Sequence, residues 1–206
     1  QWSFLTRLNL GYGNGYGEDD AGNDYLLPFW EYFRIGGQGD LRGFEPNTVG
    51  PRAVYVVPES VNSEGIPDFT GLPTPNYSSE TGNQQLFVQN NYSLGGNAKV
   101  SGGLELIVPT PFVDEGMRNS IRTSVFVDFG MVWDTEFDYD RYKDLENTSP
   151  QPLTDYSSPG DFRASAGVSV QWISPMGPLT FSLGRALKEV EGDETQVFSF
   201  NIGTTF

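Results

Sequence analysis

The sequence predicts an all-β fold, an antiparallel transmembrane β-barrel, from three observations. Six runs of about 9–12 residues alternate apolar with small or polar side chains, and a tilted strand of that length can cross a membrane. The connections between the runs alternate between short and long, as the turns and outer loops of such barrels do. With 25 glycines and 14% aromatic residues, the composition suits strands and tight turns better than helices.

The first run covers residues 2–12, and a long irregular region follows it at about residues 12–95. Within that region residues 53–57 are expected to form a short strand. The glycine-rich segment 36–44 lies in the same region, directly after a group of apolar and aromatic residues. Such apolar density favours burial over disorder, so we expect the long loop to fold back and pack against the strands.

Five further runs follow the long loop, each with one continuous apolar face and one face of small, polar or charged residues. They cover residues 98–108, 122–133, 162–172, 179–184 and 198–206. The short links are 109–119 and 174–178, whereas the links at 134–161 and 186–194 are longer. Large aromatic residues fall at strand ends, where the aromatic girdle of a membrane barrel lies: Trp2, Trp133, Trp172 and Phe206.

The alternation also predicts which side chains face lipid and which face the barrel lumen. The lipid-facing set is Trp2, Val125, Phe129, Val168, Phe181 and Phe200, and the lumen-facing set is Arg7, Glu105, Asp128 and Arg163. A soluble β-sandwich is the alternative, because its strands alternate in the same way. Six strands are fewer than the ~8 of the smallest membrane barrels, and an open sheet in lipid leaves edge amides unsatisfied. We therefore expect the chain to be the carboxy-terminal part of a larger barrel.

Composition excludes several functions. The chain has no cysteine and no histidine, which removes disulfides, thiolate metal sites and catalysis by Ser-His-Asp or Cys-His groups. A formal charge of -15 argues against nucleic acid as a partner. Acidic residues recur at every second position from Asp134 to Asp140, but Tyr139 stands where a calcium-binding loop needs glycine. We predict no enzyme activity, no cofactor and no metal site.

Arg42, Glu105 and Asp128 form the main candidate site. The two acidic residues lie on the polar faces of runs that should be neighbours, and close carboxylates repel each other unless a cation joins them. The planar guanidinium of arginine suits this bridging role, and the glycines around Arg42 would let the loop enter the lumen. The alternative is that Arg42 is a solvated surface arginine.

At these residues the sequence resembles the BamA family of outer-membrane β-barrel assembly factors. The segment Leu41, Arg42, Gly43 and Phe44 looks like the Val-Arg-Gly-Phe motif in the sixth extracellular loop of that family, with leucine in place of valine. The resemblance covers nearly the whole chain, in order, and residues of about 56–92 match least. It continues through residues 11–15, 28–33, 47–51, 103–105, 109–112, 126–133, 171–179 and 200–203.

The resemblance implies that residues 1–206 form the last six strands of a sixteen-stranded barrel in the bacterial outer membrane, preceded by periplasmic POTRA domains. Arg42 would enter the lumen on the long loop and pair with Glu105 and Asp128. Such proteins fold and insert other β-barrel proteins without ATP, through a barrel that opens between its first and last strands. The implied partners are outer-membrane lipid, unfolded β-barrel clients and periplasmic lipoproteins that would bind through upstream domains.

The last run is the second candidate site, a lateral gate. Phe200, Gly203 and Phe206 belong to it, and the resemblance places a kink of the closing strand at Gly203. A glycine inside a strand weakens pairing, and an edge exposed when strands part can pair with a client strand. Two other functions stay open: a polypeptide transporter of the two-partner secretion type and a passive porin.

Overall fold

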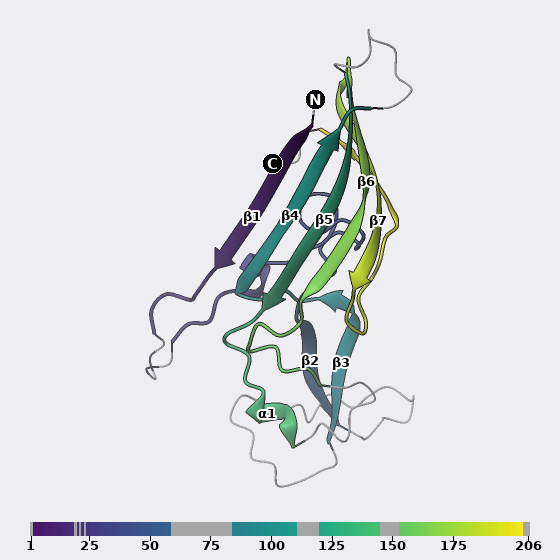
Figure 1. Ribbon diagram of the computed structural model, residues 1–206. Coiled ribbons are helices and arrows are strands. Elements are labelled where there is room, and N and C mark those ends of the chain that lie inside the picture. The colour runs from purple at the N-terminus through teal and green to yellow at the C-terminus, as the bar shows by residue number, and fades with distance from the viewer. Residues whose placement is uncertain are drawn as a thin grey trace.

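The computed structural model describes residues 2–18, 20, 22, 24–58, 84–110, 120–144 and 153–203. Six antiparallel strands form one sheet in the order β1-β4-β5-β6-β7-β8 (Figure 1). The strands are β1 (Ser3–Tyr12), β4 (Ala98–Val108), β5 (Ile121–Trp133), β6 (Arg163–Ser174), β7 (Gly177–Lys188) and β8 (Phe198–Ile202). The predicted antiparallel all-β fold is confirmed. Among the described residues, no helix is both long enough and apolar enough to cross a membrane.

The long connection between β1 and β4 contains more regular structure than the sequence predicted. The expected strand at 53–57 is β2 (Arg52–Pro58), which pairs with an unexpected strand, β3 (Gln84–Ser93). The sequence of β3 has three consecutive apolar residues, Leu86 to Val88, between polar ones, so it lacks the period-two signal of a strand. Two short helical turns, η1 (Phe29–Glu31) and α1 (Asp140–Lys143), lie in the outer connections.

The long connections that contain β2, β3 and α1 lie at one end of the sheet, and the tight β6–β7 turn lies at the other (Figure 1). That turn is tight, because Ser174 pairs directly with Gly177 across it. Strand β7 is longer than the predicted run of 179–184, since pairing with β6 continues to Lys188.

Exposure alternates along the strands, so the sheet has one exposed apolar face and one covered face. On β5, Val125 and Val127 are each 43% exposed, whereas Phe126 is 2% and Asp128 0% exposed. Phe129 and Asp128 accordingly point to opposite faces. Of the residues expected on the apolar face, these are exposed: Trp2, Val125, Val168, Phe181 and Phe200. Of those expected on the polar face, Asp128 and Arg163 are buried and Arg7 and Glu105 are partly buried.

The long loop covers the polar face and brings its own apolar core. Ile35, Leu41, Phe44 and Val49 from the loop pack with Val132 of β5 as one buried cluster. The first four are between 0% and 1% exposed. The apolar density around the glycine-rich segment thus becomes the packing that holds this segment on the sheet.

Candidate functional site on the covered face

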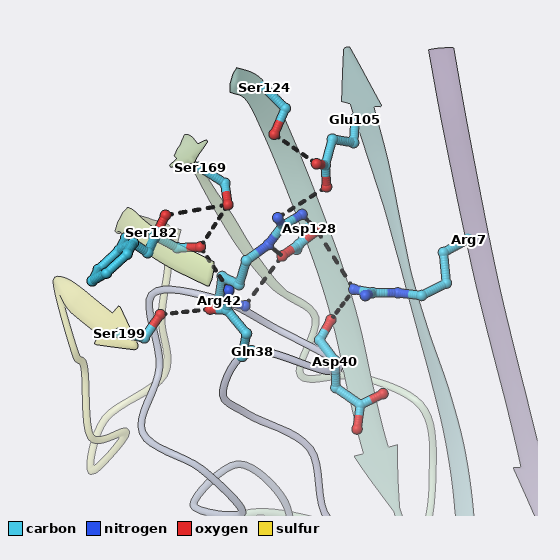
Figure 2. Close-up of polar contacts among 11 residues, drawn as sticks. Arg7, Gln38, Asp40, Arg42, Glu105, Ser124, Asp128, Ser169, Ser182 and Ser199 are labelled. Atoms are coloured by element: carbon cyan, nitrogen blue, oxygen red, sulfur yellow. Dashed lines mark hydrogen bonds and ion pairs between the residues drawn. The ribbon is translucent and has the colours of Figure 1, made fainter. Parts of the chain in front are cut away.

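Arg42 lies between the two predicted carboxylates. Its Nε and Nη2 donate hydrogen bonds to the two oxygens of Asp128 at 2.7 and 3.0 Å, and Nη1 donates to Oε2 of Glu105 at 2.9 Å (Figure 2). The backbone N–H of Arg42 also donates to Asp128, at 3.2 Å. The Arg42 and Asp128 side chains are 7% and 0% exposed. This forked geometry is the strongest form of carboxylate recognition by arginine.

The strand register brings the two carboxylates together. Asp128 on β5 lies opposite Gly103 on β4, and Glu105 follows two positions later on the same face of β4. A Cβ at position 103 would lie 2.3 Å from Oδ1 of Asp128, so the carboxylate occupies the space that a side chain there would take. Ser124 donates to the other oxygen of Glu105, Oε1, at 2.6 Å. Nη2 of Arg7 lies 3.7 Å from Oδ1 of Asp128, so both carboxylates also have partners other than Arg42.

The aromatic ring of Phe126 packs against the guanidinium of Arg42. The Cζ atom of Arg42 lies 3.5 Å from the centroid of the Phe126 ring, a close cation–π contact. The ring has room because Gly167 on β6 lacks a side chain; a Cβ there would lie 2.7 Å from Cζ of Phe126. Sequence reasoning gave Phe126 no role. The signal that could have found it is a lone large aromatic residue two positions before Asp128, on the same face of the strand.

Each residue of the loop motif has a distinct place. Leu41 and Phe44 belong to the buried cluster on either side of Arg42. Gly43 has φ +90°, a backbone conformation that residues with a side chain rarely adopt. A Cβ on Gly43 would also lie 3.1 Å from Cβ of Ser165 on β6. The glycine therefore lets the loop lie directly against the sheet next to Arg42.

A second buried ion-pair cluster joins the loop, β6 and the β7–β8 connection, and sequence reasoning missed it. Arg163 donates through Nε and Nη2 to Asp193 at 2.9 and 3.0 Å. Arg52 approaches the same carboxylate at 3.7 Å, and the backbone N–H of Val190 donates to it at 2.8 Å. The three side chains are 4%, 1% and 5% exposed for Arg163, Asp193 and Arg52. Arg163 was expected in the lumen, but Asp193 lies in an irregular link that has no periodic signal.

The closing strand ends where its glycine lies. Phe200 of β8 contacts Phe181 of β7, with ring centroids 4.9 Å apart on the exposed face. The last described strand residue is Ile202, and Gly203 follows with φ +115° while its N–H donates to the carbonyl of Pro178 at 2.8 Å. Phe206 lies outside the described residues. The role of this segment as a gate stays a prediction.

The acidic run that begins at Asp134 forms hydrogen bonds within itself and to the long loop between β1 and β4. Asp134 accepts a hydrogen bond from the N–H of Glu136 at 3.1 Å, and Glu136 accepts one from Leu27 at 3.3 Å. Burial, with the nearby Asp134 carboxylate, raises the pKa of Tyr32 to about 12, and burial raises the pKa of Asp134. Within the described part of the chain, no three His, Cys, Asp or Glu side chains cluster closely enough to hold a metal ion.

Comparison with known proteins agrees with this fold and with the resemblance found in the sequence. The chain is 30% identical to the outer membrane protein assembly factor BamA of Neisseria meningitidis serogroup B, over 96% of this chain and 21% of that protein. It is similar to the crystal structure of BamA from Haemophilus ducreyi lacking POTRA domains 1–3, with a TM-score of 0.72 and 35% identity. That match covers all of this chain and 32% of the other. The chain thus spans a fifth to a third of these relatives. The model of the Omp85 superfamily domain matches residues 1–206, and the chain therefore belongs to the Omp85 superfamily.

Proposed function

We propose that residues 1–206 are the carboxy-terminal part of an outer-membrane β-barrel that folds and inserts other β-barrel proteins without ATP. The observation that carries this proposal is the similarity to two BamA proteins over 96% and 100% of this chain. In this proposal the exposed apolar face contacts outer-membrane lipid. The sixteen-strand count, the upstream POTRA domains and their lipoprotein partners stay predictions.

The proposed mechanism is scaffolding and membrane perturbation, in which no residue has a catalytic role. Arg42, with Asp128 and Glu105, fixes the long loop to the middle of the wall formed by β4 and β5. The edge strand β8 is short and ends at Ile202, directly before Gly203, and in this proposal it is the strand that separates from its neighbour when the barrel opens. Its exposed edge would then pair with a strand of the client protein.

Reconstitution of the full-length protein tests this function. Liposomes that contain it, with its partner lipoproteins, should convert an unfolded client barrel to the folded form faster than empty liposomes, as seen by band shift on gels. A passive porin would instead show steady conductance in planar bilayers without speeding client folding. A secretion-type transporter would move a soluble polypeptide across the liposome membrane. Client folding at the rate of empty liposomes contradicts the proposal.

The closing-strand glycine provides a specific prediction. Gly203 has φ +115°, and valine favours the extended conformation, so we expect Gly203→Val to prolong the pairing of β8 with β7. If the extended closing strand resists parting by about 1 kcal/mol, the scale of one hydrogen bond, client insertion should slow roughly 5-fold. Insertion into liposomes by the reconstituted full-length protein measures this, while band shift checks that the barrel itself folds.

Gly22→Val is the matched control for that prediction. Gly22 also has a positive φ, of +82°, and, like Gly203, nothing within 4 Å of a Cβ built on it. It is an exposed residue of the long connection between β1 and β4, outside the closing strand and its partner β7. Insertion by Gly203→Val at the parental rate, or equal slowing by Gly203→Val and Gly22→Val, would show that the gate does not depend on Gly203.

A further inference from the structure

The tip of the long loop contacts strands across most of the sheet through alternate residues. Arg42 binds β4 and β5, as described above. Two residues earlier, Asp40 accepts hydrogen bonds from Ser101 of β4 at 2.9 Å and from Asn9 of β1 at 3.4 Å. Its carbonyl also accepts one from Arg7 of β1 at 2.9 Å (Figure 2). Asp40 and Arg42 together therefore bind β1, β4 and β5, the three strands on one side of the sheet.

Gln38, two residues earlier again, binds the opposite side of the sheet. Its Nε2 donates to the hydroxyl of Ser182 on β7 at 2.8 Å, and its Oε1 accepts from the hydroxyl of Ser199 on β8 at 2.7 Å (Figure 2). Ser182 and Ser199 are register partners, so one amide side chain bridges a directly opposed pair. This arrangement uses both the donor and the acceptor of the glutamine amide, which neither an apolar nor a carboxylate side chain supplies.

The bridge is anchored on both sides. Ser182 is 1% exposed and donates in turn to Ser169 of β6 at 3.0 Å. The loop backbone also pairs with the segment that leads into β8: Gln196 donates to the carbonyl of Gly43 at 3.0 Å, and Glu45 donates to that of Glu194 at 2.9 Å. The loop therefore contacts both the segment that leads into the closing strand and, at Ser199, the strand itself.

We propose that Gln38 is a positioning residue that holds β8 against β7 from the covered face. Strand β8 has five residues and forms the edge of the described sheet, so its own ladder is small. A side chain that bridges Ser182 and Ser199 adds directly to the work of parting the two strands. Gln38 lies four residues before Arg42 in the same loop, so release of the loop would also release the closing strand. This inference rests on the proposed function for its consequence, but the strand attachment can be measured without a client.

Hydrogen–deuterium exchange of the full-length protein, without client, tests the proposal. We expect Gln38→Ala and Ser199→Ala each to speed amide exchange in residues 198–202 about 3- to 10-fold, since each removes hydrogen bonds that oppose local opening. Amides of β4 and β5 should stay within twofold of the parent. The double variant should resemble the single variants, because both remove the same bridge. Ser199→Thr, which keeps the hydroxyl, should exchange like the parent.

Ser101→Ala is the matched control, since it removes a hydrogen bond of the same loop tip to β4 and should leave exchange in β8 unchanged. If Gln38→Ala fails to fold, Ser199→Ala still tests the bridge with the loop intact. Unchanged exchange in β8, or an equal rise in every strand, would overturn the proposal. Faster exchange in a protein that does not insert clients would support the bridge while contradicting the proposed function.

Discussion

Replacement of Arg42 by alanine is expected to lower the free energy of unfolding of the full-length barrel by about 3–5 kcal/mol. The reason is the charge that remains, because Asp128 is fully buried and keeps its carboxylate without its bidentate partner. Glu105 is 23% exposed, so water compensates part of the loss there. Denaturant unfolding in detergent, with band shift on gels as the readout of folded barrel, measures this difference.

Two further variants make the test of Arg42 specific. Arg42→Lys keeps the charge but not the planar fork, so its loss should be smaller than that of alanine. Combining Arg42→Ala with Asp128→Asn should recover part of the stability, since the double variant no longer buries a carboxylate whose remaining cation, Arg7, lies 3.7 Å away. Arg122→Ala is the control, because Arg122 is an exposed arginine on the same face of β5. If Arg42→Ala unfolds like the Arg122 control, the ion pair is not what holds the loop.

Much of the sheet could be predicted from the sequence because its strands have two different environments. A strand with an apolar exposed face and a polar covered face carries a period of two over its whole length, as β5 does from Thr123 to Trp133. That period fixed the faces of Glu105 and Asp128, and their charge on a covered face required a cation. The glycines around Arg42 then indicated that Arg42 is this cation, because they give the loop backbone the freedom to reach the two carboxylates.

The residues that the sequence could not provide depend on contacts made across the fold. Strand β3 pairs with β2 outside the main sheet, and its sequence has no period of two. Gln38 is one polar residue among loop glycines, and its role appears once Ser182 and Ser199 become register partners. Asp193 likewise has no periodic neighbour, and its two arginines come from positions 52 and 163. Such partners are set by tertiary packing and not by local pattern.

The second large effect is expected at Asp193, where alanine should lower the free energy of unfolding by about 3–5 kcal/mol. Asp193→Ala leaves Arg163 and Arg52 buried at 4% and 5% exposure without the carboxylate that both approach. It also removes the hydrogen bond that the N–H of Val190 donates to Asp193 at 2.8 Å. Because this cluster fixes the β7–β8 connection to β6, we expect that connection to loosen first.

A double-mutant cycle separates the ion pair from general damage at Asp193. Arg163→Ala combined with Asp193→Ala should cost less than the sum of the two single variants, since the double variant leaves neither Arg163 nor Asp193 without the other, while Arg52 keeps its hydrogen bond to the carbonyl of Gly192. Glu191→Ala is the control, because Glu191 is an exposed acidic residue in the same connection. The measurement is denaturant unfolding of the full-length barrel, with amide exchange of residues 189–197 as the local readout. Strictly additive losses would mean that Asp193 acts through the backbone of its own turn, and the connection would then be held by the loop contacts alone.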